Sequence, residues 1–227
     1  MNESGEAILR CLRDVAAERA HRAADPALAA QVAAVKSYQH SRFERTYADL
    51  LASERYTRAA RFFLEDLYGP GDFTQRDDQF ARIVPALVRL FPSELVGTVS
   101  SVAELHALSE GLDTATARAG GAALPGEAAY ANAWRAVGRP ADRERQIALM
   151  VEVGRALDRY TRKALLRQSL RLMRGPAQAA GLGALHGFLV AGFETFRAMR
   201  GADEFLSTIA RRERELAATL FGGGTAG

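Results

Sequence analysis

Apolar residues recur at three- and four-residue intervals along nearly the whole chain of 227 residues, whereas the alternation typical of a half-buried strand is almost absent. That spacing places apolar side chains on one face of an α-helix. Gly and Pro fall between the periodic segments, where they punctuate helices. The pattern therefore predicts an all-α fold, a single-domain bundle of about seven to nine amphipathic helices over residues 1–220. A disordered, Gly-rich tail is expected at 221–227.

Start and stop signals divide the chain into the expected helices. Asp25 is a suitable N-cap, and Pro26 suits the first position of a helix. The pair Gly175-Pro176 is expected to separate two helices, the second of which ends near residue 200. The other expected helices cover residues 4–21, 26–51 with a bend, 54–68, 74–91, 102–117, 127–137, 140–173 and 202–220.

Two of these helix starts carry a more specific signal. Thr74 is followed by Asp77, and Ser101 is followed by Glu104, which is the spacing of a capping box. Pro85 lies inside the helical pattern that begins at Thr74, so a kink or a break is expected there.

Composition and charge narrow the function only slightly. The net charge is +3 and the sequence pI is about 9.3, which gives weak support for a nucleic-acid partner, so we treat that partner as unlikely. Cys11 is the one cysteine, which excludes an intrachain disulfide. The first residues are acidic and polar, unlike a secretory signal, and no apolar run approaches the ~20 residues of a membrane span. These features predict a cytoplasmic protein without a membrane span.

The segment 55–91 is rich in aromatic side chains with interleaved charges. One interpretation is a helical corner packed by aromatic rings and latched by Arg–Asp pairs. The other is the wall of a polar pocket, in which Tyr56, Tyr68 and Arg76 offer hydrogen-bond donors beside an apolar surface.

The same segment carries a resemblance. FFLEDLYGP, from Phe62, and DFTQRDDQFARIVP, from Asp72, resemble a motif of an uncharacterised bacterial all-helical family. GFETFRAM, from Gly192, and FLSTIARRE, from Phe205, resemble the C-terminal part of that family. The resemblance covers most of the chain and implies a shared fold. It brings no known activity and no catalytic roles.

A second candidate site surrounds His106. Glu110 and Asp113 follow at intervals of four and seven residues, so all three lie on one helix face. Such a face could hold a metal ion or orient a general base, and it could equally be a surface histidine paired with a carboxylate. There is no HExxH motif, and a single Glu-x-x-His pair falls short of the two that a di-iron bundle needs. A likeness of this segment to the haem-binding segment of globins implies haem as an alternative cofactor, with His106 as its ligand.

A third segment, 181–199, is expected to be a mostly apolar helix in which several positions are glycine. Gly183, Gly187 and Ala191 recur every four residues, which predicts a close approach to another helix or to a second copy of the chain. His186 lies beside Gly187 and is either a hydrogen-bonded core histidine or a ligand. If His186 and His106 meet in the core, they form a site, with Glu110 as a further metal ligand.

The expected helix over 140–173 has one apolar and one basic side. A solvated face with salt bridges is the plainer interpretation. The more specific interpretation is that the basic side binds an acidic partner, which could be a protein helix, a nucleic acid or an anionic lipid. The candidate partner-binding residues are Arg155, Arg159, Arg162, Lys163, Arg167 and Arg171.

No GxGxxG, GxxxxGK[ST], GxSxG or CxxC motif is present, which lowers the expectation of common nucleotide-binding and hydrolase classes. The leading hypothesis is a ligand-binding or regulatory protein with a polar, aromatic-lined interior pocket for a small ligand and no cofactor. The first alternative is a metal- or haem-dependent enzyme or sensor that uses His106 and His186. The second is an interaction module with an acidic protein partner or a homodimer. The ligand-binding residues expected are Tyr56, Tyr68, Arg76, His106 and His186.

Overall fold

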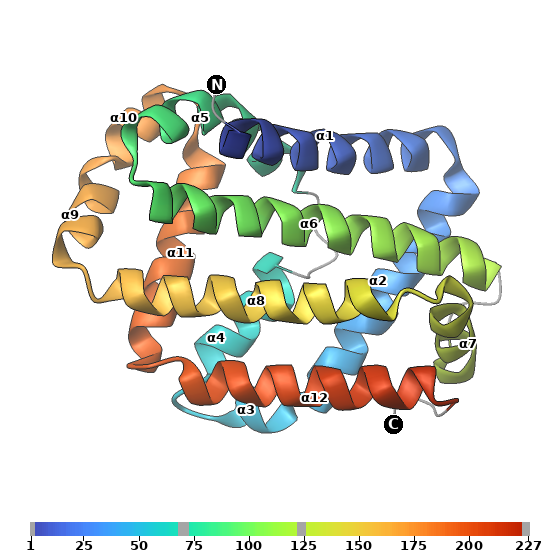
Figure 1. Cartoon of the computed structure of the whole chain (residues 1–227). Helices are drawn as coiled ribbons and strands as arrows, with labels where there is room; N and C mark the ends of the chain where they lie inside the picture. The colour runs from blue at the N-terminus through green and yellow to red at the C-terminus, as the bar shows by residue number, and fades with distance from the viewer. Residues whose placement is uncertain (1–2, 68–72, 122–125, 224–227) are drawn as a thin grey trace.

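The structure is a computed structural model of the chain, and it describes residues 3–67, 73–121 and 126–223. Within these ranges the chain forms twelve α-helices and one π-helical turn, and it contains no strand (Figure 1). The all-α prediction is confirmed, but the expected count of seven to nine helices is too low. The elements are α1 (Glu3–Ala24), α2 (Pro26–Thr46), α3 (Ala48–Ala52), α4 (Thr57–Phe62), η1 (Phe63–Leu67), α5 (Thr74–Leu90), α6 (Ser93–Gly120), α7 (Glu127–Val137), α8 (Pro140–Thr161), α9 (Ala164–Leu172), α10 (Arg174–Ala179), α11 (Gly183–Met199) and α12 (Asp203–Phe221).

The long helices form two crossing layers. In Figure 1, α1, α6, α8 and α12 run side by side, and α2, α4 and α11 cross behind them. Helix α6 packs against α1, α8 and α2, while α8 packs against α12 and α11. Helices α6 and α8 therefore occupy the centre of the molecule, and polar residues on their inner faces are enclosed by both layers.

Local signals explain several helix ends. The carboxylate of Asp25 accepts hydrogen bonds from the backbone N–H of Ala27 and Leu28, at 3.0 and 3.1 Å, and Pro26 opens α2 as predicted. The bend expected between residues 26 and 51 is an interruption at Tyr47, which separates α2 from α3. Gly138 has the left-handed φ of 60° that ends α7 at its predicted residue.

Both predicted capping boxes are wrong. Helix α5 begins at Thr74 itself with no side chain capping it, and α6 begins at Ser93, well before Ser101. Asp77 and Glu104 bind basic side chains of other helices instead of a helix terminus. Ion pairs between helices have therefore replaced the local capping bonds that the sequence pattern favours.

Two other boundaries also differ from prediction. The expected helix over 140–173 is interrupted at Arg162 and Lys163, which divides it into α8 and α9. Helix α5 continues through the exposed Pro85, so the break that was one of the two outcomes expected there does not occur. Gly175-Pro176 lies in the first turn of α10, where a missing N–H costs nothing.

The aromatic corner of the chain forms much of the main apolar core. Phe62 and Phe63 are buried, and Phe63 lies 5.4 Å from the ring of Phe205 in an edge-on arrangement. Phe196 of α11 and Tyr47 complete the same cluster. Such aromatic contacts stabilise beyond the area they bury. These rings thus join α4 and η1 to α11 and α12.

Close approaches between helices occur at other glycines than those predicted. No atom lies within 4 Å of a Cβ built on Gly183 or Gly187, so the expected close approach of another helix of the chain is wrong there, and approach of a second copy stays a prediction. At Gly192 such a Cβ would lie 3.1 Å from Phe62, and at Gly154 it would lie 2.5 Å from Leu206. Gly154 therefore permits the contact between α8 and α12.

This contact gives a first prediction. In Gly154→Ala, overpacking against the buried Leu206 costs about 1–3 kcal/mol, and the better helix propensity of alanine returns up to about 1 kcal/mol. We expect a net loss of up to about 3 kcal/mol in the free energy of unfolding, measured by urea denaturation. Gly111→Ala is the matched control, because nothing lies within 4 Å of its Cβ position. It should gain roughly 0.5–1 kcal/mol. Equal effects of both substitutions would contradict the packing argument.

Among the described residues, no helix combines the length and apolar character required to cross a membrane. Residues 224–227 of the predicted tail lie outside the described residues, whereas Phe221 belongs to α12.

Candidate functional site

A cavity of about 100 Å³ is lined by residues of α2, η1, α6, α7, α8 and α12. Each helix contributes residues spaced by three or four, the interval that places side chains on one face. Tyr130 and Trp134 of α7 provide aromatic walls. The other polar lining residues are Gln39, His40, Arg42, Ser109, Asp113, Arg143, Gln146 and Glu213.

Arg143 is the most unusual lining residue, because only 5% of it is exposed. Its guanidinium stacks on the ring of Trp134 at 3.7 Å from the centroid. Its hydrogen bonds go to neutral oxygens, at 3.3 Å on Gln146 and 3.2 Å on Thr116. No carboxylate of the described residues lies within 4 Å of it. Burial lowers the pKa of Arg143 and outweighs the opposing effect of Tyr130 and Asp113, neither of which bonds to the guanidinium.

Asp113 faces the same cavity from α6. Its carboxylate accepts a hydrogen bond of 3.0 Å from the amide of Gln39, which also lies 3.4 Å from the hydroxyl of Tyr130. Burial raises the pKa of Asp113, although the positive charge of Lys36 opposes that rise. The cavity therefore pairs a buried cation with a carboxyl group that resists ionisation.

A tightly bonded triad closes the side of the cavity next to α12. Arg42 donates to Glu213, and the hydroxyl of Tyr47 donates to the same carboxylate at 2.6 Å. Burial opposes the charge of Arg42, but Glu213 outweighs it and raises the pKa of Arg42. Burial, followed by the nearby charge of Glu213, raises the pKa of Tyr47. Glu213 thus holds one guanidinium in place, whereas Arg143 remains without such a partner.

Unpaired donors add to the polar character of the site. The indole N–H of Trp134 is buried and has no acceptor among the described residues, and the same holds for the Nε–H of Arg42. Buried polar groups normally have a hydrogen-bond partner. His40 also lines the cavity and is 26% exposed, so the cavity reaches the surface there.

Two of the residues that the sequence singled out share one carboxylate elsewhere in the molecule. His106 Nε2 lies 2.8 Å from Asp77 Oδ2, and Arg76 Nε lies 3.6 Å from Asp77 Oδ1. Arg19 of α1 completes the cluster with a bond of 2.7 Å to Asp77. Burial raises the pKa of Asp77, but the bond from His106 and the charge of Arg19 outweigh it, so the pKa lies below its usual value.

The charged groups around Asp77 already bond to one another and to other protein groups. Besides Asp77, Arg76 donates 2.9 Å to the carbonyl of Asp66 and stacks between the rings of Phe73 and Phe188, at 4.2 and 4.3 Å. The ion pairs of Asp77 and the stacking of Arg76 join α5 to α1, α6 and α11. This arrangement matches the latched-corner interpretation of the sequence more closely than a pocket wall.

The other predicted ligand-binding residues have separate partners. Tyr56 donates to Glu204 at 2.6 Å, and His186 Nε2 lies 2.8 Å from the carbonyl oxygen of Leu170. Tyr68 lies outside the described residues. The structure therefore brings Arg76 and His106 together but gives Tyr56 and His186 no contact with them.

Glu110, the remaining member of the alternative metal set, is bound by two basic side chains. Arg22 Nη1 lies 2.5 Å and Lys36 Nζ 2.8 Å from its carboxylate oxygens. Its pKa falls to about 2, because these two charges outweigh the effect of burial. In the described parts of the chain, no three or more His, Cys, Asp and Glu side chains are grouped so as to hold a metal ion.

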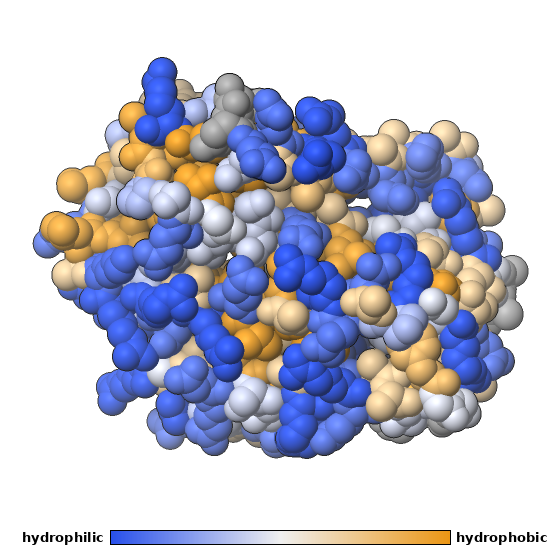
Figure 2. Space-filling view, in the orientation of Figure 1, coloured by the Kyte–Doolittle hydropathy of each residue, from blue (hydrophilic) through white to orange (hydrophobic). Residues whose placement is uncertain are grey.

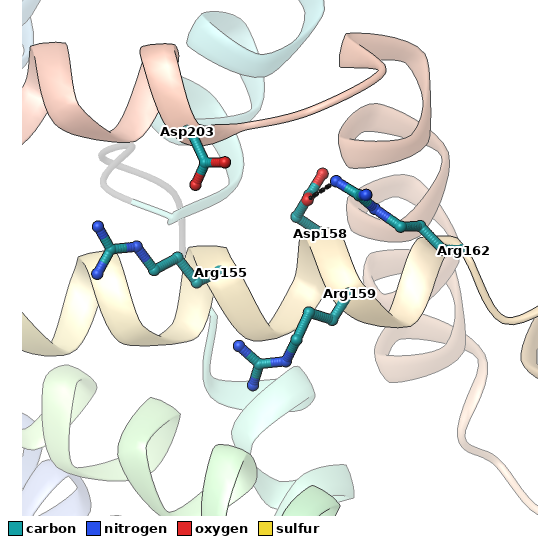
Figure 3. A pocket seen from close by; sticks show the side chains of 5 residues that line it. All are labelled: Arg155, Asp158, Arg159, Arg162 and Asp203. Carbon is teal, nitrogen blue, oxygen red and sulfur yellow. Dashed lines mark hydrogen bonds and ion pairs between the residues drawn. The ribbon is translucent and has the colours of Figure 1, made fainter.

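The basic face predicted over 155–171 divides into two parts. Arg155 and Arg159 of α8 and Arg162 at its end surround an open hollow of about 360 Å³ together with Asp158 and Asp203 (Figure 3). Arg162 and Asp158 form a salt bridge of 2.6 Å, so this part is largely a solvated face with ion pairs.

Beyond the end of α8 the basic side chains lose their acidic neighbours. Among the described residues, no carboxylate lies within 4 Å of Lys163, Arg167, Arg171 or Arg174. Lys163 instead lies over the ring of Tyr160, at 5.4 Å.

Sequence reasoning missed the residues that form the cavity, apart from noting Asp113. One signal for Arg143 was present. It precedes Ile147 by four residues and Met150 by seven, so it continues the apolar stripe of α8. A charged residue in phase with an apolar stripe indicates a buried charge. Nothing in the sequence indicated that Trp134 would lie against it.

Fold and cavity together define an all-helical, two-layered protein with a small cavity lined by aromatic, aliphatic and polar side chains. The chain belongs to a family described as a domain of unknown function, DUF8198, whose model matches residues 18–226. The resemblance to an uncharacterised family is thereby confirmed. No curated protein and no solved structure matches the chain.

Proposed function

We propose that this protein binds a small carboxylate-bearing molecule in the interior cavity. The observation that carries the proposal is Arg143, a buried guanidinium whose protein partners are all neutral. A ligand carboxylate would accept charge-assisted hydrogen bonds from its unused N–H groups and neutralise its charge. Trp134 would fix the plane of the guanidinium by stacking.

The second buried ionisable group supports the same ligand class. A carboxyl group with a raised pKa, such as Asp113, is more easily protonated and can then donate a hydrogen bond to an anionic oxygen. The free indole N–H of Trp134 offers a further donor. Donors from three elements therefore line one small space.

The volume of the cavity limits the size of the ligand. A cavity needs about 10–15 Å³ to hold one water, so about 100 Å³ accommodates on the order of seven to ten non-hydrogen atoms. This size fits a small organic acid and is too small for a nucleotide or a haem group.

The experiment uses the one tryptophan of the sequence as its reporter. We expect the fluorescence of Trp134 to change saturably with at least one of a panel of succinate, benzoate and related acids of this size. The corresponding primary amides should produce no saturable change. Arg143→Gln should weaken binding about ten- to a hundredfold, the effect of losing about 1.5–3 kcal/mol of hydrogen bonding to a charged group.

Arg145→Gln is the matched control. Arg145 lies two residues further along α8, where it is half exposed and paired with Glu104 at 2.7 Å. This variant should bind as the unmodified protein does. Equal binding of acids and amides, or an unchanged affinity in Arg143→Gln, would contradict the proposal. Thermal unfolding curves verify that each variant is folded.

A further inference from the structure

Helix α9 presents an apolar and basic surface to solvent. Leu165 is 79% exposed, Leu172 is 78% exposed and Met173 is 52% exposed. Apolar patches of this kind on a folded chain commonly mark an interaction site. Figure 1 places α9 at the left-hand extremity of the molecule, and Figure 2 shows hydrophobic colour gathered at that edge beside hydrophilic side chains. We call the exposed residues Leu165, Arg171, Leu172, Met173 and Arg174 the α9 surface.

The charge around this surface has one sign. From residue 159 to residue 193 the sequence contains six basic residues and no Asp or Glu. As described above, the last four of these have no carboxylate within 4 Å among the described residues. A basic segment of this kind attracts an anionic partner.

The helix itself is divided into an inner and an outer side. Leu166 and Leu170 are half buried, and the carbonyl of Leu170 is bonded to His186 of α11. Leu165 and Leu172 are seven residues apart, so they lie on one line along the outer side, with Arg171 adjacent. The inner leucines explain how α9 is held on the body of the protein. The outer ones make no comparable contact.

We propose that the α9 surface binds an anionic membrane surface, with Leu165 and Leu172 inserted between headgroups and the basic side chains at headgroup level. Interfacial helices combine leucines with Lys and Arg in this way. A second copy of the chain is a poorer occupant, because a two-fold contact would bring identical basic surfaces together. An acidic protein is also poorer, since helix-binding proteins receive leucines in grooves of their own and α9 projects from a convex edge.

The test is co-sedimentation of the full chain with vesicles of phosphatidylcholine containing 30 mol% phosphatidylserine, compared with phosphatidylcholine alone. We expect at least tenfold stronger partitioning onto the anionic vesicles, weakened by salt. Leu165→Ser with Leu172→Ser should reduce partitioning about tenfold or more, and so should Arg171→Glu with Arg174→Glu. All four side chains are exposed, so the fold should persist, as thermal unfolding verifies.

A charge-matched control separates this surface from the overall charge of the protein. Arg13→Glu with Arg118→Glu makes the same change in net charge at exposed positions of α1 and α6. This variant should retain most of the binding. The proposal is overturned if the control loses as much as the α9 variant, or if the leucine variant binds fully. It is also overturned if both vesicle types bind equally, or if the leucines hold a dimer in solution while no vesicle binding occurs.

Discussion

Replacing Glu110 by glutamine is expected to lower the free energy of unfolding by about 3–5 kcal/mol at pH 7, the cost of removing one partner of a buried ion pair. Glu110 is 4% exposed and joins three helices, since it lies on α6, Arg22 on α1 and Lys36 on α2. Arg22 also donates to the hydroxyl of Thr114 at 2.9 Å. The neutral variant leaves both cations without their charge partner. For a chain of this length, the midpoint of thermal unfolding should fall by on the order of 10 °C.

The pH dependence gives the same prediction a sharper form. The pKa of Glu110 is lowered from 4.5 to about 2 in the folded protein, so its contribution is present above pH 4.5 and is lost as the pH falls towards 2. The difference corresponds to about 3 kcal/mol. The stability gap between the unmodified protein and Glu110→Gln should therefore narrow by about that amount between pH 6 and pH 2. A gap that stays constant over this range would refute the assignment.

Asp113→Asn is the control for this experiment, three residues further along the same helix. The pKa of Asp113 is raised, so its stabilising contribution is present below pH 3.8 and is lost as the pH rises through its folded pKa. Asparagine has nearly the same shape and can still accept from Gln39. At pH 7 this variant should be as stable as the unmodified protein or more stable. Denaturation at both pH values separates the two carboxyl groups, because their effects have opposite signs.

Glu110 and Asp113 also illustrate what the sequence could and could not predict. The spacing of His106, Glu110 and Asp113 correctly placed three ionisable groups on one helix. The spacing could not show that each group has a different partner. His106 contacts Asp77, Glu110 contacts Arg22 and Lys36, and Asp113 contacts Gln39. Those partners come from α1, α2 and α5, and their positions depend on how the helices cross. Contacts between distant segments are fixed by packing, which a local period does not encode.

Helix boundaries were likewise predictable only where a local signal sets them. The start of α2 and the end of α7 were predictable, because Asp25 and Gly138 act within one turn of the chain. The division between α8 and α9 was not predictable from its neighbours, since the amphipathic pattern continues across it. The cavity is lined by none of Tyr56, Arg76, His106 and His186, and the ligand-binding pocket that the sequence suggested stays a prediction. The aromatic rings most conspicuous in the sequence fill the core instead.

Glu213→Gln is expected to lower the free energy of unfolding and to raise the affinity for a carboxylate ligand. Glu213 is the acceptor for both Arg42 and Tyr47, and its side chain is 20% exposed. Because this pair is less buried than Glu110, the loss in the free energy of unfolding should be about 2–3 kcal/mol. The remaining amide oxygen can still accept a hydrogen bond, but the charge that holds the guanidinium of Arg42 is gone.

The cavity of this variant would then contain two guanidinium groups without a carboxylate partner, Arg42 and Arg143. We expect its affinity for a carboxylate probe to rise up to about tenfold, which corresponds to about 1.4 kcal/mol, as Trp134 fluorescence measures. Glu215→Gln serves as the matched control, because Glu215 is exposed on the same helix and pairs with Arg211 at 3.0 Å. It should change neither quantity by more than about 0.5 kcal/mol. Weaker carboxylate binding in Glu213→Gln would mean that Glu213 positions Arg42 for the ligand rather than competing with it.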